Sequence, residues 1–129
     1  MTKQAKFASW VAQLVVVGII GPAGVIKLMG SPDPILLFET LGVEPWGRYF
    51  TAAMEIGASI LILIPATIPI GGLLTAVIML GAIGSHLTIL GIDWGGDVSL
   101  FVMAIVAFLA SVATVMLRSR AIDDAELGL

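Results

Sequence analysis

Three ionisable side chains, Lys27, Glu55 and His86, stand inside long apolar runs of the 129-residue chain. An ionisable group is costly in hydrocarbon unless it is paired or hydrated. Carboxyl and imidazole groups carry protons in membrane interiors, so Glu55 and His86 are suited to exchange protons with a bound molecule. Lys27 is suited to hold Glu55 as a carboxylate or to stabilise a developing oxyanion. These three residues are the candidate site for ligand binding or proton exchange.

Each of the three also has a purely structural interpretation. Lys27 lies near the end of its apolar run, where a lysine can extend to the lipid headgroups. Glu55 is central in its run, so its alternative is a hydrogen bond that holds helices together. For His86 the alternative is a hydrogen bond between helices. A direct Lys27–Glu55 or His86–Glu55 contact and a single bridging water are the competing geometries.

Small and hydroxyl-bearing residues surround the candidate site. Thr51 and Ser59 lie four positions before and after Glu55, and Ser85 directly precedes His86, so we include them as supporting residues. Small residues also recur four positions apart, as Ala53 with Gly57 and Gly81 with Ser85. Such spacing either lets helices approach closely or leaves room beside the polar groups for a ligand.

The composition indicates a membrane protein. Hydrophobic residues make up 59% of the chain, charged residues make up 12%, and the mean hydropathy is +1.12. A helical span needs about 20 apolar residues. The sequence has room for four, over residues 10–29, 45–64, 70–90 and 98–117. We therefore predict one all-α membrane domain over residues 1–129, folded as a four-helix bundle with antiparallel neighbours.

The basic residues near the span ends predict the orientation. Lys3 and Lys6 precede the first span, and Arg118 and Arg120 follow the last. The connection between the second and third spans is uncharged, whereas the other two connections are mainly acidic. We predict that both termini are cytoplasmic, that residues 118–129 form a frayed or surface-bound tail, and that the protein lies in a cell membrane of the prokaryotic inner-membrane type.

The first external connection, "GSPDPILLFETLGVEP", contains a short apolar patch between prolines. This pattern predicts a short interfacial helix that covers the outer end of the bundle. The alternative is an ordinary apolar loop packed on the bundle.

Several function classes are excluded by residue usage. The chain has no cysteine, so it has no disulfide, thiol redox couple, iron–sulfur cluster or thiolate zinc site. Its single histidine does not build a metal site or ligate a haem on both faces. A net charge of −3, with six Lys and Arg spread along the chain, argues against a nucleic-acid partner. We expect no metal and no intrinsic cofactor.

Four motifs in order along residues 10–117 resemble the DoxX family of small four-span membrane proteins, in its DoxX-like branch. They are "GVIKLMG" at the end of the first span, "LLFETLG" in the external connection, "MEIGASILIL" in the second span and "MLGAIGSHL" in the third. The matching positions include Lys27, Glu55 and His86. The resemblance implies a four-helix bundle and an association with quinone-linked redox metabolism, because some relatives resemble subunits of thiosulfate:quinone oxidoreductase.

Three classes of function follow from these observations. The leading hypothesis is an accessory membrane protein that holds a lipophilic molecule, such as a quinone or a lipid, in an outer-side cavity. It would serve a quinone-linked oxidoreductase as a subunit, or act as a homodimer. The alternatives are a small proton-coupled transporter that uses Glu55 and a scaffold subunit of a membrane complex. An enzyme acting alone is the least supported class, because no nucleophile is paired with an oriented base.

Overall fold

The computed structural model describes the backbone of residues 1–126 and the side chains of residues 1–120. Five α-helices make up the described chain: α1 (Lys3–Met29), α2 (Pro32–Thr40), α3 (Trp46–Leu63), α4 (Ile68–Ser85) and α5 (Ser99–Glu126). The predicted all-α class is confirmed.

The helix ends follow local sequence signals. The hydroxyl of Thr2 accepts a hydrogen bond from the Ala5 amide at 3.0 Å, which satisfies a free donor at the start of α1. Gly30 ends α1 with a φ of 74°, a left-handed conformation that glycine adopts without a steric penalty. Proline stands in the first turn of both α2 and α4, where its missing amide costs no hydrogen bond.

The predicted third span, residues 70–90, divides into two kinds of helix. Regular α4 ends at Ser85, and a π-helical turn continues over His86–Leu90 until Gly91, which has a φ of 82°. The turn widens the helix at the histidine. Single π turns of this kind are often found at functional sites.

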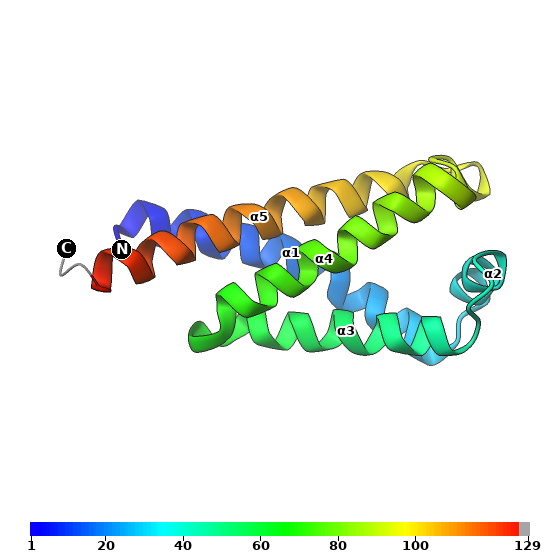
Figure 1. Cartoon of the computed structure of the whole chain (residues 1–129), viewed down its shortest axis with the longest axis horizontal. Coiled ribbons are helices and arrows are strands. Elements are labelled where there is room, and N and C mark those ends of the chain that lie inside the picture. Colours follow the sequence, from blue (N-terminus) through cyan, green and yellow to red (C-terminus); the bar gives the residue numbers. More distant parts are fainter. Residues whose placement is uncertain (127–129) are drawn as a thin grey trace.

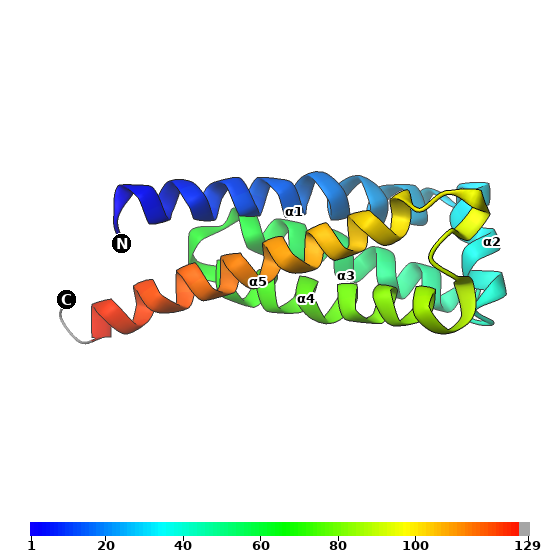
Figure 2. The same cartoon turned by 90° about the horizontal axis from the view of Figure 1, so that it is seen from above.

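The four long helices pack in a ring in which α1 contacts α3 and α5, and α4 contacts α3 and α5. Figure 1 shows the two chain ends at one end of the molecule and α2 at the other. From the α3–α4 turn toward α2, α4 and α5 diverge from α3 in this view. Figure 2 shows α5 crossing the bundle obliquely, with α2 again at the end away from the termini.

Three helical segments within the described residues are long and apolar enough to cross a membrane: Lys3–Met29, Pro65–Leu90 and Ser99–Arg120. Their outer faces carry exposed large apolar side chains, including Leu14, Val77 and Leu109. Such a surface is suited to lipid and not to water. The chain is therefore a small helical, multi-pass membrane protein. Helix α3, which contains Arg48 and Glu55, is not among the three segments.

Two of the predicted connecting segments take definite form. The first external connection contains a helix, α2, with Phe38 buried against the bundle. Helix α5 continues beyond the predicted end of its span at residue 117 and reaches Glu126. The predicted tail is thus helical for most of its length, and its last part, residues 127–129, lies outside the described residues.

Close helix packing occurs at glycines other than the predicted ones. A Cβ atom at Gly71 would lie 2.8 Å from the Ile62 backbone nitrogen, and one at Gly72 would lie 2.8 Å from the Val115 side chain. At Gly57 and Gly81 a Cβ would meet nothing within 4 Å. Of the two alternatives for these small residues, close approach therefore does not occur at Gly57 or Gly81, and Gly81 borders open space.

Candidate ligand cavity

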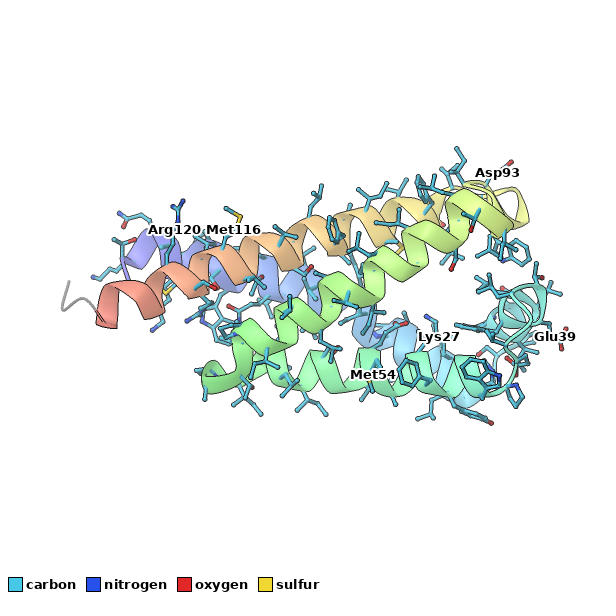
Figure 3. All side chains as sticks on the ribbon, viewed as in Figure 1. Lys27, Glu39, Met54, Asp93, Met116 and Arg120 are labelled. Atoms are coloured by element: carbon cyan, nitrogen blue, oxygen red, sulfur yellow. The ribbon has the colours of Figure 1, made fainter. Side chains whose placement is uncertain are left out.

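A cavity of about 500 Å³ lies between the diverging helices at the α2 end. All five helices contribute to its wall, and most of the wall is apolar. The larger apolar side chains that line it include Ile20, Phe38, Phe50, Met54, Val77 and Met103. Figure 3 labels Met54 on α3 and Lys27 beside α3, on the side toward α2.

Lys27 and Glu55 form a direct ion pair beside this cavity. The Lys27 Nζ lies 2.9 Å from Glu55 Oε1, which settles their predicted geometry as a contact without a bridging water. The Glu55 side chain is 3% exposed and the Lys27 side chain is 20% exposed. Gly24 permits this approach, because a Cβ there would lie 3.1 Å from the Glu55 Cβ. The pair joins α1 to α3.

The second carboxylate oxygen of Glu55 has no hydrogen-bond partner. Among the described side chains, Glu55 Oε2 is the one buried polar atom in this condition. A buried acceptor without a partner costs roughly 1–3 kcal/mol, and more when it is charged. Buried polar groups of native proteins are nearly always satisfied, so an unpaired oxygen at a cavity wall calls for an explanation such as a bound molecule.

His86 borders the same cavity but makes no hydrogen bond with Glu55 or Lys27 in the structure. Its Nδ1 lies 2.9 Å from the Gly91 carbonyl oxygen, within the π-helical turn, and its ring packs edge-on against Phe101 with centroids 5.7 Å apart. The alternative of a hydrogen bond between helices is therefore wrong, since the bond is local. Because a carbonyl only accepts, Nδ1 carries the proton, and Nε2 of the neutral ring is an acceptor.

The supporting hydroxyl groups already have acceptors. Thr51, Ser59 and Ser85 each donate to the carbonyl four residues earlier, at 2.8, 2.9 and 2.8 Å respectively. Thr51 and Ser85 line the cavity, whereas Ser59 does not. A hydroxyl that donates to its own helix can still accept a hydrogen bond.

Arg48, which is not among the predicted site residues, positions the end of α1. It is 4% exposed, and its Nε lies 2.9 Å from Glu44 Oε1. Its Nη1 donates to the backbone carbonyl of Lys27. This bond satisfies a carbonyl at the end of α1 and fixes the residue that pairs with Glu55. The four-residue spacing of Glu44 and Arg48 was the available sequence signal.

A second buried polar cluster, here called the Gln13 cluster, consists of Ser9, Gln13 and Arg118 near the chain termini. The Gln13 amide donates to the Ile62 carbonyl at 2.9 Å. Its Oε1 accepts from the Ser9 hydroxyl at 2.6 Å and from Arg118 Nη2 at 3.2 Å. Arg118 Nε also donates to Ser9. From the sequence, Arg118 is an orientation signal only, although Gln13 is a polar residue within an apolar run.

The described residues contain no group of three or more His, Asp or Glu side chains placed to hold a metal ion. The chemistry that this arrangement offers is hydrogen bonding and proton exchange at a largely apolar surface.

In comparisons with known proteins, the chain matches no family model, no curated protein and no solved structure. The resemblance to the DoxX family therefore stays a prediction.

Proposed function

We propose that this membrane protein binds a lipophilic small molecule of the quinone class in the cavity between its helices. In this proposal α3 also crosses the membrane, which brings the number of spans to four. Both termini are cytoplasmic, and the cavity lies on the outer side of a cell membrane. The observation that carries the proposal is the apolar cavity of about 500 Å³ lined in part by Glu55, whose buried Oε2 has no partner.

The dimensions and lining of the cavity support this function. Small-molecule sites typically enclose about 300–1,000 Å³ and combine a mainly apolar wall with a few placed polar groups. Here the wall is apolar except for a few side chains, chiefly Lys27, Thr51, Glu55, Ser85 and His86. Exposed apolar side chains such as Phe50 and Val77 border the cavity as well. A ligand dissolved in the bilayer could therefore enter from the lipid.

Lys27 supplies a hydrogen-bond donor for an oxygen of the ligand. An ammonium group has three donors, and Glu55 Oε1 engages one of them. The choice of a quinone among lipophilic ligands depends on the DoxX resemblance. A role as an accessory subunit of a quinone-linked oxidoreductase depends on that resemblance too, as does the identity of any protein partner.

Filling the cavity tests this function. Gly81 borders the cavity, and a Cβ there would meet nothing within 4 Å, so Gly81→Leu can occupy the space without a clash at Cβ. We expect purified wild-type protein to bind a decyl-tailed benzoquinone, detected as quenching of tryptophan fluorescence, because Trp46 lines the cavity. We expect Gly81→Leu to lower this affinity by about tenfold or more, as the ligand and the new side chain compete for volume.

The matched control is Gly57→Leu. Gly57 is also a helical glycine at which an added Cβ would meet nothing within 4 Å, but it does not line the cavity. The affinity of this variant for the benzoquinone should equal that of the wild type. Equal affinities in all three proteins would remove the cavity as the binding site.

A further inference from the structure

The polar side chains that border the cavity offer mainly acceptors. Glu55 Oε2 is a free carboxylate oxygen. The His86 Nδ1 faces the Gly91 carbonyl, so the neutral form of the ring presents Nε2 as an acceptor. The Thr51 and Ser85 hydroxyl protons are directed to carbonyls of their own helices. Lys27 is the exception: Glu55 engages one of its three donors, and the other two can bond an oxygen of either a quinone or a hydroquinone.

From this imbalance we infer that the cavity selects a lipophilic ligand with two hydroxyl donors, and that it binds a hydroquinone more tightly than the corresponding quinone. This inference rests on the proposed function and specifies the ligand form. A hydroquinone brings two O–H donors for acceptors that otherwise lack one. A quinone brings two carbonyl oxygens, which are acceptors only: Lys27 can donate to one of them, but neither can bond the free oxygen of Glu55.

The burial of the two acceptors strengthens this preference. Glu55 is 2% exposed and its Oε2 is buried, so water competes weakly for this atom, and the His86 residue is 5% exposed. A hydrogen bond to a charged group is worth more than one between neutral groups, and sites with buried acceptors reject analogues that lack the donor. We expect the hydroquinone to bind at least about tenfold more tightly than the quinone.

Three ligands that share a tetramethylated six-membered ring test this preference for donors. They are tetramethylhydroquinone, tetramethylbenzoquinone and the dimethyl ether of the hydroquinone, which keeps the ring and removes both donors. Binding to the wild-type protein is measured in detergent under argon with a chemical reductant for the hydroquinone sample. The chain has no cysteine, so the reductant has no protein disulfide to alter.

A preference of about tenfold for the hydroquinone over both other ligands would support the inference. Equal or tighter binding of the benzoquinone would overturn it and leave the proposed function intact. If none of the three ligands binds, the proposed function fails as well. The fourth ligand tested is monoolein, a lipid with two free glycerol hydroxyls. If monoolein binds more tightly than the hydroquinone, the inference that the cavity selects a hydroquinone is wrong.

A variant locates the preference at Glu55. In Glu55→Gln the amide nitrogen can donate to a quinone carbonyl, so the ratio of hydroquinone to quinone affinity should fall toward one. Glu39→Gln is the matched control, because Glu39 is an exposed carboxylate on α2 that does not line the cavity. An unchanged ratio in a folded Glu55→Gln protein would overturn the assignment of this residue.

Discussion

The two buried polar clusters of this protein lie toward opposite ends of the bundle and differ in how completely they are satisfied. In the Gln13 cluster, the amide, the hydroxyl and the guanidinium group bond with one another and with the Ile62 carbonyl. Beside the cavity, Lys27 engages one oxygen of Glu55 and leaves the other free. The residue type alone therefore does not show whether a polar side chain in a membrane interior belongs to a binding site. The Gln13 cluster joins helices, whereas the Lys27–Glu55 pair leaves an acceptor available.

Helix spacing explains this difference. At the closed end of the α3–α4 pair, Gly71 packs against the Ile62 backbone, and the Gln13 amide of α1 reaches the Ile62 carbonyl. At the α2 end, Gly81 faces open space, and α4 and α5 diverge from α3. Polar groups on the separated helices there cannot all find partners within the protein.

The largest expected effect is an asymmetry between the two members of the ion pair. Lys27→Met leaves the buried Glu55 carboxylate with neither oxygen partnered and should lower the free energy of unfolding by about 3 kcal/mol. Glu55→Gln replaces the carboxylate with a neutral amide and leaves a lysine that is 20% exposed and can reach water, so its change should stay within about 1 kcal/mol. Denaturant titration in mixed micelles measures both.

Lys6→Met, at an exposed lysine of α1, controls for the loss of a lysine. Equal destabilisation by Lys27→Met and Glu55→Gln would contradict this account, in which an unpaired Glu55 carboxylate destabilises the fold more than an unpaired Lys27.

The next effect concerns the satisfied cluster. Gln13→Leu removes hydrogen bonds to Ser9, Ile62 and Arg118 and should cost about 2–3 kcal/mol of unfolding free energy, at about 0.6–1.7 kcal/mol per bond in a membrane protein. Ligand affinity should not change, because Gln13 does not line the cavity. The same unfolding titration, together with the quinone-binding assay, tests both parts.

Gln4→Leu, at an exposed glutamine of the same helix, is the matched substitution and should be nearly neutral. A loss of ligand affinity in Gln13→Leu without a loss of stability would reverse the roles assigned to the two clusters.

A smaller effect distinguishes the closed and open parts of α4. Gly71→Ala places a Cβ 2.8 Å from the Ile62 backbone nitrogen and should destabilise the protein by about 2 kcal/mol, since a packed interface must separate. Gly81→Ala meets nothing within 4 Å and should stabilise the helix by about 0.5–1 kcal/mol. Thermal unfolding of the two variants side by side gives the comparison. Changes of the same sign would show that the helices are equally close at both positions.

The smallest effect lies in the exposed connection on the cavity side. Asp97 accepts hydrogen bonds from the backbone amide and hydroxyl of Ser99, which lower the pKa of its carboxyl below the ordinary value of 3.8. The carboxylate therefore stabilises the start of α5 above that pH, and its contribution is lost as the pH falls through the lowered pKa. Unfolding midpoints of wild type and Asp97→Asn, measured from about pH 5 to about pH 3, should converge as the pH falls. A constant difference would exclude this carboxylate as the source.

Part of the site was predictable from the free-energy cost of placing ionisable side chains in a membrane. Charged and titratable groups in apolar runs must be paired, hydrated or functional, and this rule identified Lys27, Glu55 and His86 without any knowledge of their contacts. The direct Lys27–Glu55 contact was one of the competing geometries predicted for these residues. The rule could not distinguish a partner supplied by another helix from one supplied by the residue's own turn, so the local bond of His86 to Gly91 was missed.

The sequence by itself determined the all-α class, the apolar surface suited to lipid and the chain positions of the helices, because hydropathy, proline and glycine act locally along the chain. Tertiary structure alone decided which small residues bring helices together, which polar side chains are satisfied and where space remains. Those properties depend on distances between helices. Gly71 and Gly81 are the same residue type on one helix, yet one meets a backbone and the other meets a cavity.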